Sequence, residues 1–232
     1  MSNLELRLKA IARIETDFST KFGIPRQSGI INELVGRVVF EEEYRNTDAI
    51  RGLSEYSHVW LLWGFSENVR DDWSPTVRPP KLGGNKRVGV FATRSPFRPN
   101  PIGLSCVELK KVEIDKELGP VLYVAGADLM NGTPIYDIKP YLTYTDSKPN
   151  AKGGFTDELH LQKLLVELPD NIKEKIPGDK QRALVEVLEQ DPRPAYHNDP
   201  ERIYGFEYAG YEVKFKVVEN VLKVCEVEEV KK

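Results

Sequence analysis

Hydrophobic and polar residues alternate with a period of two near both ends of this chain. Residues 4–9 alternate three leucines with three charged residues, and residues 211–217 alternate in the same way after the pair Ala209-Gly210. This period puts every second side chain on one face, which is typical of a half-buried strand. The Ala209-Gly210 pair marks a turn before the second stretch. The pattern therefore predicts a strand at each end of the chain.

More strands are predicted within the first 140 residues. Their segments are short, rich in β-branched and aromatic residues, and separated by glycine, proline and asparagine. The candidates are 36–41, 58–65, 87–93, 104–114 and 121–127. Residues 58–65 are nearly all apolar, so we expect that strand to be buried on both faces. Many short strands with few helical patterns predict an antiparallel β-barrel or a sandwich.

The pattern changes after residue 144. Residues 145–154 are polar and contain proline and a glycine pair, which indicates a linker or mobile loop. A helix is predicted over 179–190, with Asp179 as its cap and Pro192 as its stop. Its apolar stripe at helical spacing is Ala183, Leu184, Val187 and Leu188. We therefore predict a mainly β fold: a barrel domain at 1–144 and a small α+β subdomain at 155–232.

Composition indicates a soluble, cytoplasmic globular protein. The chain has 232 residues, of which 40% are hydrophobic and 30% charged. Its longest uncharged apolar run, 59–65, is far shorter than the roughly 20 residues that span a bilayer. Charges within residues 5–9 interrupt any signal-peptide pattern. The two cysteines, Cys106 and Cys225, form neither a disulfide framework nor a zinc site.

Positive charge is concentrated in one segment. The formal net charge is −3, but residues 78–98 hold six basic and no acidic residues. The rest of the chain therefore has 27 basic and 36 acidic residues, a net charge of −9. A basic segment on an acidic body favours selective binding of an anionic ligand. A merely solvated basic loop is the alternative.

This basic segment continues into a region rich in proline and glycine, 78–105. Its prolines disfavour helix and central strand, and the glycines at 83–84 allow a ligand to approach the backbone closely. Arg94 and Arg98 flank Phe97, a grouping that can pair with a carboxylate or phosphate and stack on a base. Alternatively, Phe97 belongs to the core and the arginines pair with acidic residues.

Three further loops contain candidate site residues. Residues 25–27 form a stiff polar loop, Asp128 follows a predicted strand, and 191–196 places an arginine and a tyrosine after the predicted helix. A surface turn, a turn-capping aspartate and a helix stop are the respective alternatives. The chain has no G-x-G-x-x-G motif, so a Rossmann-type cofactor loop is not supported.

Together these segments resemble the TsaA-like family, also called YaeB, and within it the TrmO-type tRNA methyltransferases. The matching segments follow the family's order along nearly the whole chain: 21–27, 51–58, 78–105, 128–134, 137–141 and 191–196. The resemblance implies a β-barrel enzyme that uses S-adenosylmethionine without a Rossmann fold or a metal and works as a homodimer. The implied substrate is tRNA with N6-threonylcarbamoyladenosine at position 37, chiefly threonine tRNA, methylated on N6. An RNA- or nucleotide-binding barrel without catalytic activity is the alternative.

The resemblance also implies site residues. Carried over position by position, the cofactor contacts fall on Arg26, Gln27, Ser28, Ser66, Glu67, Arg94, Leu104, Ala125, Gly126, Ala127 and Asp128. We expect Arg94 or Arg26 to pair with the methionine carboxylate and Asp128 or a nearby tyrosine to act as the base. The candidates for tRNA contacts are Lys81, Lys86, Arg98 and Arg193 for phosphates and Tyr196 for stacking.

Overall fold

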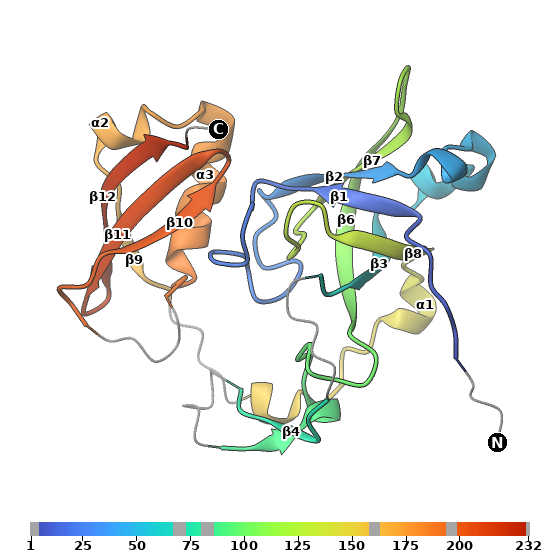
Figure 1. Ribbon diagram of the computed structural model, residues 1–232, viewed down its shortest axis with the longest axis horizontal. Coiled ribbons are helices and arrows are strands. Elements are labelled where there is room, and N and C mark those ends of the chain that lie inside the picture. The colour runs from blue at the N-terminus through green and yellow to red at the C-terminus, as the bar shows by residue number, and fades with distance from the viewer. Residues whose placement is uncertain (1–4, 67–72, 80–85, 158–162, 194–198, 231–232) are drawn as a thin grey trace.

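The computed structural model describes residues 5–66, 73–79, 86–157, 163–193 and 199–230. Two β-rich bodies lie side by side in Figure 1, with the N-terminal body on the right and the C-terminal body on the left. The N-terminal body is a closed barrel in which every neighbouring pair of strands is antiparallel. Around the barrel the strands are β1 (Ala12–Glu15), β2 (Val35–Phe40), β7 (Gly119–Ala125), β6 (Ile102–Asp115), β3 (His58–Gly64) and β8 (Pro134–Pro140). Closure pairs both edges of the sheet, as predicted for a barrel.

Alternation along the barrel strands produces its core. Side chains that point inward, among them Ile14, Val38 and Leu122, are fully buried in one hydrophobic cluster. Strand β3 is buried on one face only, which differs from the prediction. Its outer face is partly covered by the short helix α1 (Thr143–Asp146), where Trp60 Nε1 donates a hydrogen bond of 3.0 Å to Asp146.

Two other strand predictions are wrong. Residues 5–9 form no strand, because β2 ends at Phe40, opposite Ala12, so these residues have no partner strand. Within 87–93 only β5 (Val88–Gly89) is a strand, paired with β4 (Thr76–Val77). The chain then turns into a 3-10 helix, η5 (Val90–Ala92), because the backbone N–H and the hydroxyl of Thr93 both donate to the carbonyl of Val90.

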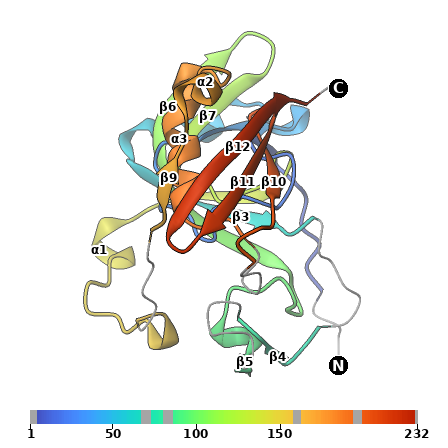
Figure 2. The ribbon, with the colours of Figure 1, turned by 90° about the vertical axis from the view of Figure 1, so that its left-hand side faces the viewer.

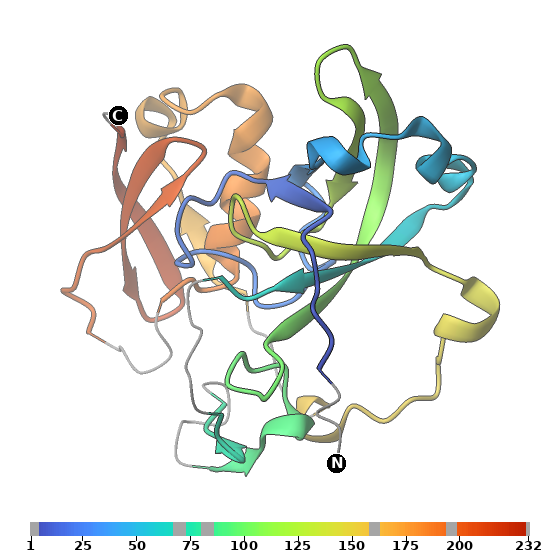
Figure 3. The ribbon, with the colours of Figure 1, turned by 45° about the vertical axis from the view of Figure 1, so that its right-hand side comes forward.

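Short 3-10 helices and one long hairpin complete the N-terminal body. The helices are η1 (Glu42–Tyr44), η2 (Thr47–Ile50), η3 (Leu53–Glu55) and, after the barrel, η6 (Gly154–Thr156). The hairpin of β6 and β7 extends beyond the other barrel strands (Figure 3). Across the described residues, no helix is long and apolar enough to cross a membrane.

The C-terminal body, which faces the viewer in Figure 2, is a four-stranded sheet packed on a helix. Its strands are ordered β10 (Tyr204–Tyr208), β11 (Tyr211–Val218), β12 (Val221–Glu229) and β9 (Leu165–Glu167), and only β9 runs parallel to its neighbour. The short helix α2 (Asp170–Lys173) precedes α3 (Gly178–Glu189). The predicted β11 strand and its turn are confirmed, since Ala209 and Gly210 both have positive φ angles.

Helix α3 is confirmed with its predicted apolar stripe fully buried. The predicted cap is wrong. Asp179 lies in the first turn, and Pro177 occupies the N-cap position, without a side-chain hydrogen bond. A proline fixes φ near the helical value and lacks an N–H, so the helix begins here without a capping hydroxyl or carboxylate. The helix ends at Glu189, before Asp191 takes a positive φ angle and Pro192 follows.

One loop of the N-terminal body also packs into the C-terminal body. The β1–β2 loop, residues 16–34, leaves the barrel and places Phe18, Ile31 and Leu34 in the hydrophobic core of the C-terminal body. Burying three apolar side chains there stabilises the loop by removing them from water. Because this loop returns directly to β2, its position is fixed by both bodies.

Candidate functional site

Asp128, shortly after the end of β7, is the last member of a partly buried chain of polar side chains. Its Oδ1 atom accepts a hydrogen bond of 2.5 Å from the hydroxyl of Ser105 on β6. That hydroxyl in turn accepts one of 2.9 Å from Nε1 of Trp63 on β3. Ser105 is fully buried, so its hydroxyl needs both partners to replace water. The chain Trp63–Ser105–Asp128 therefore fixes one face of the carboxylate.

The electrostatic surroundings of Asp128 favour a proton acceptor. Burial raises the pKa of its carboxyl above the ordinary value. Four interactions act against that rise in the pKa. They are the hydrogen bond from the Ser105 hydroxyl, the one from the backbone N–H of Asp128 itself, the positive charge of Arg94, and the hydrogen bond from the backbone N–H of Ser28. A carboxylate that holds a proton more strongly than usual, yet is stabilised by donors on several sides, suits general-base chemistry.

Gly126 lets the β1–β2 loop come close to this carboxylate. The backbone N–H of Gly29 donates to the Gly126 carbonyl at 2.9 Å, and the Gly126 N–H donates to the Leu34 carbonyl at 2.9 Å. Gly126 has a φ of 77°, and a Cβ there would lie 3.0 Å from the Cα of Gly29. A side chain would therefore be strained and would press on the loop. The glycine thus allows Ser28 to reach Asp128.

Arg94 connects the basic segment to the same place. Its Nη1 atom donates a hydrogen bond of 2.5 Å to Oε1 of Gln27. Its charge also acts on Asp128. Gln27 and Ser28 are half-buried, whereas Arg94 is exposed. Three segments that are far apart in the sequence, 26–28, 94 and 125–128, therefore meet in one group with charges of both signs.

The other predicted cofactor residues differ in how exposed they are. Leu104 is next to Ser105 on β6 but is exposed on the outer face of the barrel, where it pairs with Leu62 of β3. Arg26 and Ser66 are exposed as well. Ala125, Gly126 and Ala127 are buried at the end of β7, so mainly their backbone groups are available to a ligand. Glu67 lies outside the described residues.

The predicted tRNA residues divide into two groups. Lys86 is exposed and Arg98 half-buried, and among the described residues neither has a carboxylate partner within 4.0 Å. The side chain of Arg193 is only 11% exposed and donates two hydrogen bonds, of 2.7 and 2.8 Å, to Asp191. This bidentate pair engages two N–H groups of Arg193 with Asp191 just after α3. Lys81 and Tyr196 lie outside the described residues.

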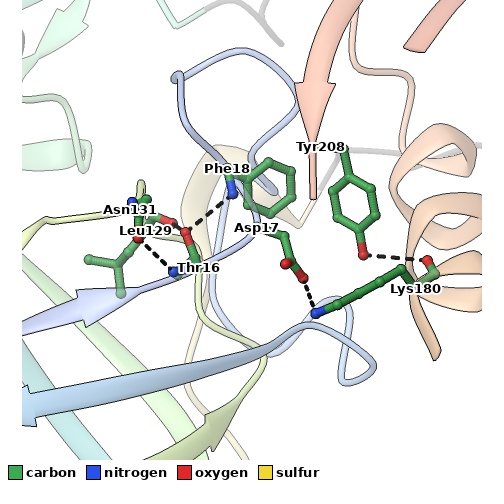
Figure 4. A network of polar contacts seen from close by, with 7 residues as sticks. All are labelled: Thr16, Asp17, Phe18, Leu129, Asn131, Lys180 and Tyr208. Atoms are coloured by element: carbon green, nitrogen blue, oxygen red, sulfur yellow. Dashed lines mark hydrogen bonds and ion pairs between the residues drawn. The ribbon is translucent and has the colours of Figure 1, made fainter. Parts of the chain in front are cut away.

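The start of the β1–β2 loop is tied to the turn that follows Asp128 (Figure 4). The Thr16 backbone N–H donates to Oδ1 of Asn131 at 3.1 Å, and the Thr16 hydroxyl donates to the Leu129 carbonyl at 3.0 Å. The Phe18 N–H donates to the Thr16 hydroxyl at 3.4 Å. These bonds hold the loop and the turn as one unit beside the candidate site.

Asp17, between Thr16 and Phe18 in the loop, is bonded to the C-terminal body (Figure 4). Nζ of Lys180 on α3 lies 2.6 Å from a carboxylate oxygen of Asp17. The Ala209 N–H donates to the Asp17 carbonyl at 2.8 Å, and the Tyr208 hydroxyl donates to the Lys180 carbonyl at 3.4 Å. The loop that presents Gln27 and Ser28 is thus supported from both bodies.

Comparisons with known proteins agree with this two-body arrangement. A family model described as the tRNA-methyltransferase O N-terminal domain matches residues 13–147, and one described as the TrmO C-terminal domain matches 160–230. This chain belongs to the TrmO family. It is 37% identical over 230 residues to the tRNA (adenine(37)-N6)-methyltransferase of Escherichia coli K12, covering 96% of this chain and 97% of that protein.

Other similar proteins match this chain over all or part of its length. The crystal structure of TrmO from Pseudomonas aeruginosa superposes with a TM-score of 0.79 and 30% identity, covering 97% of this chain and 98% of that one. A probable S-adenosyl-L-methionine-binding protein of Methanothermobacter thermautotrophicus is 35% identical over 147 residues. That match covers 98% of the archaeal protein but only 63% of this TrmO family chain. That relative is thus matched over nearly its whole length by about two thirds of this chain.

Proposed function

We propose that this TrmO family chain is an S-adenosylmethionine-dependent methyltransferase that modifies N6 of adenine 37 in tRNA. The curated relatives with this name support the proposal, and the E. coli protein matches over nearly the full length of both chains. One structural observation supports it independently. Arg94, Gln27, Ser28 and Asp128 converge beside an acid-free basic segment, which fits a charged cofactor next to a polyanionic substrate.

The chemistry of the converging residues fits S-adenosylmethionine. That cofactor has a carboxylate, an ammonium group, a sulfonium and an adenine, so its site needs donors, acceptors and both signs of charge. Arg94 supplies a guanidinium, Asp128 a carboxylate and Gln27 an amide. Within the proposal, Arg94 or Arg26 pairs with the methionine carboxylate. Backbone groups of residues 125–127 contact the adenine. When bound, the cofactor supplies an activated methyl group.

Asp128 is the proposed proton acceptor. The finer substrate that we propose is N6-threonylcarbamoyladenosine, whose N6 atom is conjugated to a carbonyl and therefore weakly basic. Removing the N6 proton makes that nitrogen a better nucleophile, and a carboxylate with a raised pKa can take the proton. The remaining task of the residues is to align donor and acceptor, which supplies much of the acceleration in such reactions.

The proposal extends to partners. Lys86 and Arg98, together with Lys81, contact tRNA phosphates, chiefly those of threonine tRNAs. We also propose that the enzyme acts as a homodimer in the cytoplasm and that it needs no metal. We propose a domain division at 1–144, 145–154 and 155–232, with the proposed cofactor residues on the first domain and contacts that support them on the last.

Mass spectrometry tests the reaction directly. The chain is incubated with S-adenosylmethionine and threonine tRNA that has the threonylcarbamoyl group, and the nucleosides are analysed. We expect a gain of one methyl group on the modified adenosine, and none on tRNA without the threonylcarbamoyl group. A catalytically inactive RNA-binding barrel would bind the tRNA but would give neither methyl transfer nor heat in a titration with S-adenosylmethionine.

A further inference from the structure

Two exposed aromatic rings, one within the basic segment 78–98 and one shortly before it, stack on each other. Trp73 is 49% exposed and Phe91 is 72% exposed. Their ring centroids are 6.2 Å apart and the planes are inclined by 24°. We call them the Trp73–Phe91 pair. They belong to the region around β4 and β5, which projects away from the barrel strands in Figures 1 and 2. Large apolar side chains grouped at the surface mark a binding site more often than isolated ones do.

The backbone around the Trp73–Phe91 pair is well supported. Val90, next to Phe91, is buried, and its N–H donates to the Pro75 carbonyl at 3.0 Å. The Ser74 N–H donates to the Phe97 carbonyl at 3.3 Å, and its hydroxyl donates to the Thr76 carbonyl at 2.6 Å. The rings are therefore presented by an ordered frame. A ligand that stacks on them would lose little affinity to ordering of the protein.

The charges around the pair point to a polyanion. The described residues 73–79 and 86–98 contain Arg78, Lys86, Arg87, Arg94 and Arg98 and no Asp or Glu. Within the described part of the chain none of these five has a carboxylate partner within 4.0 Å. Aromatic faces among cations are the means by which proteins bind unpaired nucleotides: the cations follow the phosphates and the rings stack on the bases.

Self-association through the same surface is disfavoured by symmetry. A two-fold interface centred on the pair would bring the same basic segment of both copies together. Like charges facing each other across an interface oppose association. The positive charges that repel a second copy of the chain attract a polyanion. We therefore assign an RNA occupant to this surface.

We propose that the Trp73–Phe91 pair is the stacking site for an unpaired base of the tRNA anticodon loop. This inference rests on the proposed function. The 3-10 helix η5 holds Phe91, and Arg94 follows three residues later and contacts Gln27 beside Asp128. The same ordered segment thus joins the pair to the candidate methyl-transfer site. A base stacked on the pair would help to hold the loop in place while the neighbouring adenine is modified.

Binding of an anticodon stem-loop RNA with the threonine tRNA sequence tests this inference. For Trp73→Ala and Phe91→Ala we expect affinity to fall about 5- to 150-fold, the range for losing one stacked base. The dependence of affinity on salt should keep its wild-type slope, because no cation is lost. Affinity for S-adenosylmethionine, measured by calorimetry, should not change. Trp73→Phe should restore most of the RNA affinity.

Two control variants separate stacking from other effects. Tyr144→Ala removes an aromatic side chain on α1 that is 85% exposed and lies outside the basic segment, so RNA binding should be unchanged. Arg98→Ala should reduce the salt slope by about one. If Trp73→Ala does not fold, Phe91→Leu serves instead, because it keeps apolar area at an exposed position and removes only the aromatic face.

The outcomes distinguish this inference from the proposed function. Wild-type RNA affinity in both Trp73→Ala and Phe91→Ala, in a chain that methylates tRNA, would overturn the stacking site alone. The stacking site would also be overturned if these variants kept wild-type RNA affinity and changed only the molecular mass measured by light scattering. The pair would then be a contact between copies of the chain. A wild-type chain that binds the RNA with no methyl transfer would contradict the proposed function and leave the stacking site supported by the binding data.

Discussion

The hydroxyl of Ser105 lies 2.5 Å from Oδ1 of Asp128 and is itself a hydrogen-bond acceptor for Trp63. Neither neighbour is near Asp128 in the sequence, yet both belong to adjacent barrel strands. The barrel therefore sets the orientation of the carboxylate through side chains that need not touch a substrate. This relationship makes the chemistry of Asp128 sensitive to residues on β3 and β6.

Removing the Ser105 hydroxyl should shift the pH dependence of methyl transfer. The hydrogen bond lowers the pKa of Asp128 against the effect of burial, so Ser105→Ala should raise that pKa further. A base acts only when deprotonated. The acid limb of kcat/KM should therefore move to higher pH, and the activity lost at low pH should partly return as pH rises.

The measurement is kcat/KM against pH for the wild type, Ser105→Ala and Ser105→Thr, which keeps a hydroxyl. Loss of a buried hydrogen bond to a charged group also predicts a decrease of about 1.5–3 kcal/mol in the free energy of unfolding. An equal drop in activity at every pH, with the acid limb unmoved, would show that Ser105 has only a structural role.

Arg94→Ala should weaken cofactor binding while tRNA binding stays largely intact. Arg94 contacts Gln27 beside Asp128, and its proposed partner is a carboxylate of the cofactor. Loss of a charge-assisted hydrogen bond predicts at least about a 10-fold fall in affinity for S-adenosylmethionine. Calorimetry measures this affinity and gel retardation measures tRNA binding. Equal losses for both ligands would show that Arg94 belongs to the tRNA surface as well.

Lys180→Met should weaken the cofactor site from a distance. Asp17 and Lys180 are mostly buried at the junction of the two bodies, and Asp17 would remain without its cation. We expect the free energy of unfolding to fall by about 1–3 kcal/mol, between the values for exposed and buried pairs. Affinity for S-adenosylmethionine should also decrease, because the β1–β2 loop presents Gln27 and Ser28.

Chemical denaturation and calorimetry measure these two effects. Lys163→Met is the matched control, since its pair with Glu189 lies at the surface of the same body and should contribute little. The double variant Asp17→Asn, Lys180→Met should lose less stability than the sum of the single variants. Unchanged cofactor affinity in Lys180→Met would mean that the loop holds its place without this pair.

Gly103→Ala, on β6, should disturb the polar chain Trp63–Ser105–Asp128. A Cβ at Gly103 would lie 2.2 Å from the indole ring of Trp63, so the ring must move away from Ser105. Overpacking of this kind costs about 1–3 kcal/mol of stability. Near-ultraviolet circular dichroism should report the displaced indole, and methyl transfer should decline.

Gly178→Ala is the control for Gly103→Ala. A Cβ at Gly178 meets no atom within 4 Å, and the residue begins helix α3. Alanine favours helix over glycine, so stability should stay the same or rise slightly. A Gly103→Ala protein as stable as the wild type would indicate that Trp63 can move without cost.

Local patterns predicted much of the fold. Strands β2, β6 and β7 were expected from short β-branched and aromatic segments bounded by turn residues, and strand β11 and helix α3 from their apolar periodicity. The prediction for residues 5–9 was wrong because alternation alone does not supply a neighbouring strand. Likewise, residues 87–93 look like a strand in isolation, but hydrogen bonds to Val90 turn the chain after two residues of β5.

The candidate site was predictable only in part. Motifs located Gln27, Ser28, Arg94 and Asp128, and the structure brings these four together. Sequence reasoning missed Ser105 and Trp63, because a lone serine in an apolar strand has no distinguishing pattern. The useful signal was the alternation itself: it turns Ser105 inward, where a hydroxyl needs a partner, but the partner depends on strand register.

The β1–β2 loop also has consequences for how such chains diversify. Its residues Phe18, Ile31 and Leu34 are covered by the C-terminal body. Cutting this chain after the barrel would expose those three side chains to water and promote aggregation. A lineage that gains, loses or exchanges the second half of the protein therefore also needs substitutions in this loop, which lies inside the first half.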